Sequence, residues 1–197
     1  DFFYMELPNW TKMYLLTGDE GYLDKQRELY DDRKQELYDE ESGLFYRDRN
    51  YIYDPDAVYD PDSSGNNQKV SPNGKKVLWA RGNGWAMAAL ARVLEDLPDD
   101  REEDRLGYET TFKKMAETLI QVQGEDGFWR MNLDDHAHDI RPETSGTVFF
   151  AYGLTWGSNH GLLDKETYYP AVRKAFLGLN ANAFRPDGLV GRSELIS

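Results

Sequence analysis

The residues best suited to chemistry lie in the stretch WARGNGW, which contains Trp79, Arg81, Asn83 and Trp85. A guanidinium group is planar and matches a carboxylate with two parallel hydrogen bonds, and indole rings pack well against the C–H face of a sugar. The combination indicates a binding site for a carboxylated sugar. The alternative is a helix start whose tryptophans belong to the core and whose arginine is a solvated surface charge. The stretch alone is compatible with both interpretations.

These side chains must be positioned by the elements around them. A short extended run precedes the motif, residues 81–84 (RGNG) favour a turn, and a helix is expected from Trp85 to Leu97. Two glycines around an asparagine allow a tight turn and a close approach of the backbone to a ligand. We therefore expect Trp79 and Arg81 to lie at the entrance of this helix.

Apolar residues recur at helical spacing along most of the chain. Helices are expected over residues 1–17, 21–38, 85–97, 103–123, from 143 onward, and 165–183. Pro8 is expected to kink or divide the first of them, and Thr144 or Ser145 to cap the helix that follows Glu143. That helix is apolar on nearly all sides, whereas the last is amphipathic. This alternation predicts an all-α fold with an inner and an outer layer of helices.

Three segments that follow helices repeat a glycine turn, an apolar pair and an arginine. They are residues 40–48, 124–132 and 186–194, with their glycines at 43, 127 and 188. The unequal spacing indicates structural recurrence rather than a solenoid of fixed period. The first copy is expected to form a short strand. Residues 50–76, rich in Asp, Pro, Asn and Ser, are expected to be an ordered excursion over one face.

Composition excludes several classes of function. The chain has 197 residues, which suits one domain, and its 23 Lys and Arg against 36 Asp and Glu give a net charge of −13. This charge argues against a nucleic acid or an anionic membrane as partner, although arginines gathered locally can still bind an acidic ligand. Aromatic residues at 14% suit a sugar-binding cleft, and the absence of cysteine excludes disulfides and thiolate sites.

Two stretches hold residues that can ligate metals. Residues 60–65 (DPDSSG) resemble the start of a calcium loop, but Ser71 stands where the bidentate glutamate belongs, which favours a solvated loop. His136 and His138 lack the helical spacing of paired ligands and are typical of exposed loop histidines. His160 is expected in a helix C-cap. We therefore expect no metal and no other cofactor.

Three blocks of the sequence together resemble the unsaturated glucuronyl and rhamnogalacturonyl hydrolases of glycoside hydrolase families 88 and 105. The blocks are DFFYMELPNW, RGNGWAMAAL and RPETSGTVFFAYGLTWGSNHGLLD, in the order of the family. The resemblance implies an (α/α)6 toroid, the six-hairpin glycosidase fold. Residues 1–197 would form a single partial domain of about three inner and outer helix pairs with short strand-like loops, the N-terminal part of the toroid being missing from them. It also implies a bacterial protein of the cytoplasm or periplasm, with oligomeric state open.

The resemblance makes Asp1, the first residue of the DFFYM run, the catalytic residue. It implies a substrate whose non-reducing uronyl residue carries a C4=C5 double bond left by a lyase. An aspartate protonates C4 of this vinyl ether and water adds at C5. A free α-ammonium beside Asp1 would lower its pKa where the reaction needs it raised, so we expect the chain to be part of a longer protein. The alternative role of Asp1 is a helix N-cap.

The resemblance also implies a set of substrate-binding residues. They are Met5, Arg47, Trp79, Arg81, Asn83, Trp85 and Glu143. Arg81 is expected nearest the uronate carboxylate. Arg47 stands where the family often has histidine, a departure that leaves the subfamily open and suits a second anionic group such as a sulfate. Glu143 has the equal alternative of a charge at a helix N-terminus.

Two other functions stay open at this point. One is a noncatalytic carbohydrate-binding toroid that keeps the aromatic cleft. The other is a different (α/α)6 sugar enzyme, an epimerase or a lyase, which would be expected to carry a catalytic histidine or tyrosine pair in place of Asp1 and RGNGW. The parent polysaccharide, its linkage and the family's second active-site aspartate are not specified by this sequence.

Overall fold

The structure is a computed structural model that describes residues 2–62, 68–138 and 140–192. Over these ranges it contains six α-helices: α1 (Phe2–Thr17), α2 (Gly21–Leu37), α3 (Ala80–Asp96), α4 (Glu102–Val122), α5 (Thr144–Asn159) and α6 (Lys165–Asn182). Strands β1 (Tyr38–Asp39) and β2 (Leu44–Phe45) pair antiparallel, with Tyr38 opposite Phe45, and a 3-10 turn, η1 (Arg49–Tyr51), follows. The prediction of an all-α fold is confirmed.

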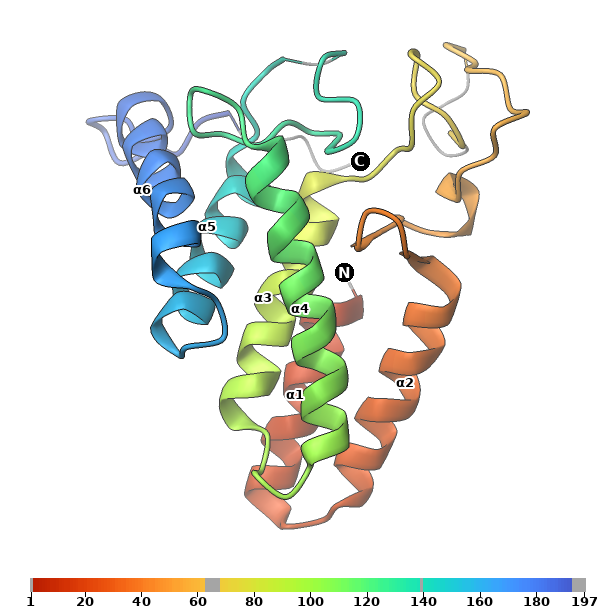
Figure 1. The fold of residues 1–197 in the computed structure, drawn as a ribbon, viewed down its shortest axis with the longest axis vertical. Helices are drawn as coiled ribbons and strands as arrows, with labels where there is room; N and C mark the ends of the chain where they lie inside the picture. The colour runs from red at the N-terminus through yellow and green to blue at the C-terminus, as the bar shows by residue number, and fades with distance from the viewer. Residues whose placement is uncertain (1, 63–67, 139, 193–197) are drawn as a thin grey trace.

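The helices form three antiparallel hairpins in two layers. Helix α3 packs against both α1 and α5, and each of these three packs against the helix that follows it. Helix α3 buries side chains along most of its length, whereas α2 buries only Leu23, Gln26 and Tyr30. In Figure 1, α1, α3 and α5 run away from the end of the molecule that carries the long loops, and α2, α4 and α6 run back toward it. We call this the loop-bearing end.

Helix α3 begins at Ala80, so the predicted turn through residues 81–84 and the predicted start at Trp85 were wrong. The RGNG sequence forms the first turn of the helix itself. A Cβ atom on Gly84 would lie 2.9 Å from the Cβ of Phe149 and 3.3 Å from the Cα of Gly146. Gly84 is therefore needed for the close approach of α3 to α5, a requirement that a local turn pattern does not reveal.

Helix α1 continues through Pro8, so the division of the helix that was one of two expectations was wrong, and a kink at this residue stays a prediction. Pro8 is buried. A proline inside a helix removes one backbone hydrogen bond, and burial against neighbouring elements offsets that loss.

The three glycine turns recur in space as predicted. Gly43, Gly127 and Gly188 have φ angles of 70°, 87° and 85°, which favour glycine. The turn at Gly43 packs against Lys114 of α4, and the turn at Gly127 packs against Lys174 of α6. Each of these two turns therefore lies against the outer helix of the next hairpin. None of the helices that the structure describes combines the length and the hydropathy needed to cross a membrane.

Candidate substrate-binding site

Three of the predicted site residues meet at the loop-bearing end. The guanidinium carbon of Arg81 lies 4.7 Å from the centre of the Trp79 ring, and that of Arg47 lies 5.7 Å from it. Arg47 follows β2 along the chain, and its guanidinium also donates a hydrogen bond of 3.0 Å to the hydroxyl of Tyr51. We call Arg47, Trp79 and Arg81 the indole cluster. Tyr51 was not predicted, although its place four residues after Arg47 was a signal.

The chain enters the indole cluster along a short backbone ladder. Trp79 and Asn132 form an antiparallel bridge. The side-chain amide of Asn132 accepts a hydrogen bond from the N–H of Leu78 at 3.0 Å and donates one to the carbonyl of Lys76 at 2.9 Å. The main chain before α3 is thereby fixed against residues 131–133.

Asn83 is buried, with 1% of its surface exposed. Its Oδ1 accepts a hydrogen bond from the N–H of Phe45 at 2.8 Å, and its Nδ2 donates to the carbonyls of Phe45 at 2.9 Å and Trp79 at 3.0 Å. The amide is thus engaged with main chain from two segments. These contacts give Asn83 a structural role. Substrate binding by this residue stays a prediction.

Glu143 is also buried, with 2% of its surface exposed, and it is the N-cap of α5. Its carboxylate accepts hydrogen bonds from the N–H groups of Ser145 and Gly146 at 2.8 and 2.5 Å and from Ser145 Oγ at 2.6 Å. The predicted cap at Thr144 or Ser145 was therefore wrong, because the carboxylate of the preceding Glu143 accepts from the first N–H groups of the helix. Contact of Glu143 with substrate stays a prediction.

An aromatic group connects α1 to the same end of α3. The ring of Trp85 lies 4.4 Å from those of Tyr4 and Phe149. Tyr4 was not predicted as a substrate-binding residue. Met5 is 51% exposed on α1. The first turns of α1 therefore lie beside α3 and α5, as a shared site on the inner helices requires.

Two predictions fall wholly or partly outside the described residues. Asp1 lies outside them, and its catalytic role stays a prediction. Residues 60–65, which were expected to form a solvated loop rather than a calcium site, are described only as far as residue 62. Within the ranges that the structure does describe, no group of three or more His, Cys, Asp or Glu side chains is placed to hold a metal ion.

The electrostatics at the start of α3 suit an anion. The first turn of α3 has no acidic residue. The N-cap is Trp79, and its side chain makes no hydrogen bond to the N–H groups of the helix. The positive end of the helix dipole therefore adds to the charges of Arg47 and Arg81. Asp48 lies 3.7 Å from Arg47 and offsets part of this charge.

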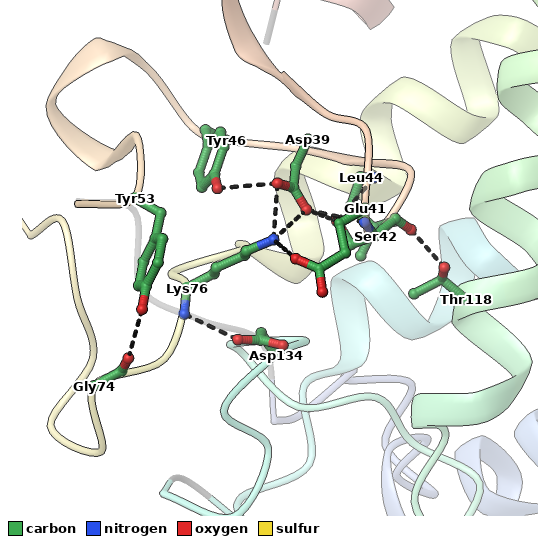
Figure 2. Close-up of polar contacts among 10 residues, drawn as sticks. All are labelled: Asp39, Glu41, Ser42, Leu44, Tyr46, Tyr53, Gly74, Lys76, Thr118 and Asp134. Carbon is green, nitrogen blue, oxygen red and sulfur yellow. Dashed lines mark hydrogen bonds and ion pairs between the residues drawn. The ribbon is translucent and has the colours of Figure 1, made fainter. Parts of the chain in front are cut away.

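A polar network around Lys76 holds the β1–β2 hairpin in place (Figure 2). The ammonium of Lys76 lies 2.9 and 2.8 Å from the two oxygens of Asp39 and 2.6 Å from Glu41, and its backbone N–H donates to Asp134 at 2.9 Å. Burial alone would raise the pKa of Asp39, but hydrogen bonds from Lys76 and Ser42 outweigh it and hold the pKa below its usual range. The network joins the hairpin to the segment that leads into Trp79.

Fold and site together define a helical-hairpin protein with a cationic aromatic cluster at the start of the inner helix α3. All 197 residues match Glycosyl Hydrolase Family 88. The chain belongs to this family, as the three sequence blocks predicted. Solved structures of the family have the six-hairpin glycosidase fold, which confirms the predicted toroid class.

The chain is similar over most of its length to one named hydrolase sequence and to solved structures. The chain is 38% identical over 176 residues to an unsaturated 3S-rhamnoglycuronyl hydrolase of Formosa agariphila, a match that covers 89% of this chain and 44% of the relative. A family 88 glycosyl hydrolase structure from Bacteroides vulgatus superposes with a TM-score of 0.86 at 37% identity, covering 99% of this chain and 52% of that one. A structure named as a polysaccharide lyase superposes with a TM-score of 0.85 at 41% identity, and the match covers 98% of this chain and 51% of that one. The chain spans about half the length of these proteins.

Proposed function

We propose that the protein containing this chain hydrolyses unsaturated uronyl residues from the non-reducing end of lyase-generated oligosaccharides. The observation that carries the proposal is the indole cluster, in which two guanidinium groups lie beside one indole in a chain of net charge −13. Such a cluster is suited to a planar carboxylate on a sugar ring. Membership of family 88 supports the reaction class.

The proposed reaction hydrates the C4=C5 double bond. The carboxyl group of Asp1 transfers a proton to C4, and the positive charge develops at C5 and the ring oxygen. Water then attacks C5 and returns a proton to the carboxylate. The resulting hemiketal opens and releases the next sugar. Arg81 is assigned to the uronate carboxylate, which it would orient next to the acid.

The substrate class is proposed from the relatives. The Formosa relative is named for an unsaturated rhamnoglycuronyl substrate, and we assign the same class to this protein. Arg47 extends the cationic surface beyond Arg81, which suits a second anionic group such as a sulfate ester on the sugar. This assignment rests on the position of Arg47 beside Trp79 and Tyr51.

A second candidate, a polysaccharide lyase, is favoured by the name of one structural neighbour. The two reactions change the ultraviolet absorbance of the sugar in opposite directions. A hydrolase that hydrates the double bond removes the ultraviolet absorbance of the conjugated uronate, whereas a lyase creates that absorbance from intact polymer.

The test is to follow this absorbance when the full-length protein meets intact acidic polysaccharides and the oligosaccharides that lyases release from them. A fall with one oligosaccharide supports the proposal and names the substrate. A rise with an intact polymer would replace the hydrolase by a lyase. Binding without any change in absorbance would instead identify a carbohydrate-binding module. The Asp1→Asn variant should bind sugar and lose turnover.

A further inference from the structure

The start of α3 is joined to the preceding glycine turn by one side chain. Phe45 lies two residues after Gly43, and its N–H and carbonyl are both bonded to the amide of Asn83. The same amide donates to the carbonyl of Trp79, the residue before the helix. We call Phe45, Trp79 and Asn83 the first junction.

The start of α5 repeats this arrangement. Trp129 lies two residues after Gly127, and its N–H donates to Thr147 Oγ1 at 3.0 Å. The hydroxyl of Thr147 donates to the carbonyl of Glu143, the residue before that helix, at 2.6 Å. We call Trp129, Glu143 and Thr147 the second junction. Asn83 and Thr147 occupy equivalent places, four residues after the N-cap of their helices.

The two junctions differ in how the turn carbonyl is bonded. At the second junction the carbonyl of Trp129 accepts from the backbone N–H of Glu143 at 3.1 Å. At the first junction the carbonyl of Phe45 accepts from the side chain of Asn83 at 2.9 Å. The side-chain amide of asparagine has two N–H donors, whereas threonine has a single O–H donor. The additional donor of Asn83 bonds to the turn carbonyl, which at the second junction is bonded by a backbone N–H.

The first junction determines where the indole cluster forms. Arg47 lies two residues after Phe45, and Arg81 lies two residues after Trp79, so a single amide connects the segments that carry the two guanidinium groups. We propose that Asn83 is a positioning residue that sets Arg47 against Trp79 and Arg81, so that the indole cluster meets an acidic sugar as one preformed surface. The inference rests on the proposed function for the nature of the ligand.

The Lys76–Asp39 ion pair holds the same hairpin at its turn. Loss of the Asn83 bonds should therefore loosen Arg47 without releasing the hairpin. Asn83→Thr places at the first junction the residue that the second junction uses. Threonine can keep the bonds to Phe45 N–H and Trp79 carbonyl and cannot make the bond to the Phe45 carbonyl.

The test measures KM and kcat of the full-length protein for Asn83→Thr, Arg47→Ala and the double variant. Asn83→Thr is expected to raise KM about tenfold with kcat little changed, which corresponds to the loss of one hydrogen bond. In the double variant the two effects should fall well short of their product, because Asn83 acts through Arg47. Effects that multiply in full would overturn the proposal, and so would an unchanged KM.

Thr147→Val is the matched control, since it breaks the equivalent bond at the second junction. It should lower the melting temperature and leave KM unchanged. An equal rise in KM for both variants would show a merely structural role for Asn83.

Amide hydrogen exchange gives a readout that does not depend on turnover. Residues 44–47 should exchange faster in Asn83→Thr than in the unaltered protein, with the helices unchanged, and unchanged exchange there would overturn the proposal. If the unaltered protein consumes no unsaturated oligosaccharide, the proposed function fails while this measurement still decides the role of Asn83.

Discussion

The junctions before α3 and α5 share a hydrogen-bond pattern and differ in the charges around it. At the second junction the buried carboxylate of Glu143 caps its own helix, and the neighbouring Arg130 pairs with Asp126 at 3.1 Å. At the first junction the N-cap is Trp79, whose side chain makes no cap bond, and Arg47 and Arg81 lie over its ring. One scaffold thus carries a carboxylate at the start of α5 and two guanidinium groups at the start of α3.

The difference indicates how a repeated scaffold acquires a binding site. The N-cap of α5 supplies a carboxylate to the helix N-terminus, whereas the first turn of α3 contains Arg81 and no acid. A helix N-terminus and an arginine both favour an anion. We therefore expect the carboxylate of the ligand to take at α3 the electrostatic role that Glu143 has at α5.

The largest effect is expected from removing Arg81, which lies two residues after Trp79 of the first junction. Arg81→Ala should lower kcat/KM about a hundredfold or more, as is usual when one partner of a desolvated charge pair is truncated. Arg130→Ala is the counterpart at the second junction and should lower thermal stability with little change in kcat/KM. Similar losses of kcat/KM in both variants, measured in full-length protein, would erase the functional contrast between the junctions.

Removing the acid of the second junction, Glu143, is expected to lower stability and to leave sugar binding unchanged. Glu143→Ala should lower the free energy of unfolding by about 2 kcal/mol, because two helix N–H groups lose a buried acceptor. The affinity for the acidic sugar should stay within the error of the unaltered protein. Chemical unfolding and sugar titration of the same samples check both values, and a weakened affinity with normal stability would give Glu143 the substrate contact.

A smaller effect is expected from the ion pair between Lys76 and Asp39, which lies outside the first junction. The folded state holds the pKa of Asp39 low. The pair with Lys76 therefore stabilises the fold above the unfolded pKa, about 4, and this contribution is lost as the pH falls through the lower folded value.

Lys76→Met should lower the unfolding free energy at neutral pH by about 1 kcal/mol and flatten its fall toward acid. Urea unfolding over a pH series checks this. Glu41→Gln is the control, since the Glu41 side chain is 85% exposed and should contribute little. Parallel pH curves for the unaltered protein and Lys76→Met would contradict the assignment.

The sequence predicted those features that depend on local pattern. Apolar periodicity placed all six helices, and the glycines of the three turns have the positive φ that their pattern indicated. The start of α3 was misplaced because Gly84 serves a contact with α5, and contacts between helices are not written in local spacing.

The sequence named three residues that the structure brings together, and their role in substrate binding stays a prediction. Arg47, Trp79 and Arg81 were named from the sequence, and the structure brings them together. The bonds of Asn83 to Phe45 join residues 38 positions apart, so no motif within the RGNG stretch could reveal them. The sequence predicted Glu143 as a possible charge at the start of a helix and assigned the cap to Thr144 or Ser145, and the fold was needed to identify Glu143 as the cap.

The most direct test compares two sugars that differ in one group. The Asp1→Asn variant of the full-length protein is titrated with an unsaturated uronyl disaccharide and with its carboxyl-reduced, neutral counterpart. We predict that the acid binds at least about tenfold more tightly, through charge-assisted bonds to Arg81, and that adding Arg81→Ala abolishes the preference. Equal binding of both sugars, or a preference that survives Arg81→Ala, would contradict the assignment of the indole cluster as the acidic-sugar site.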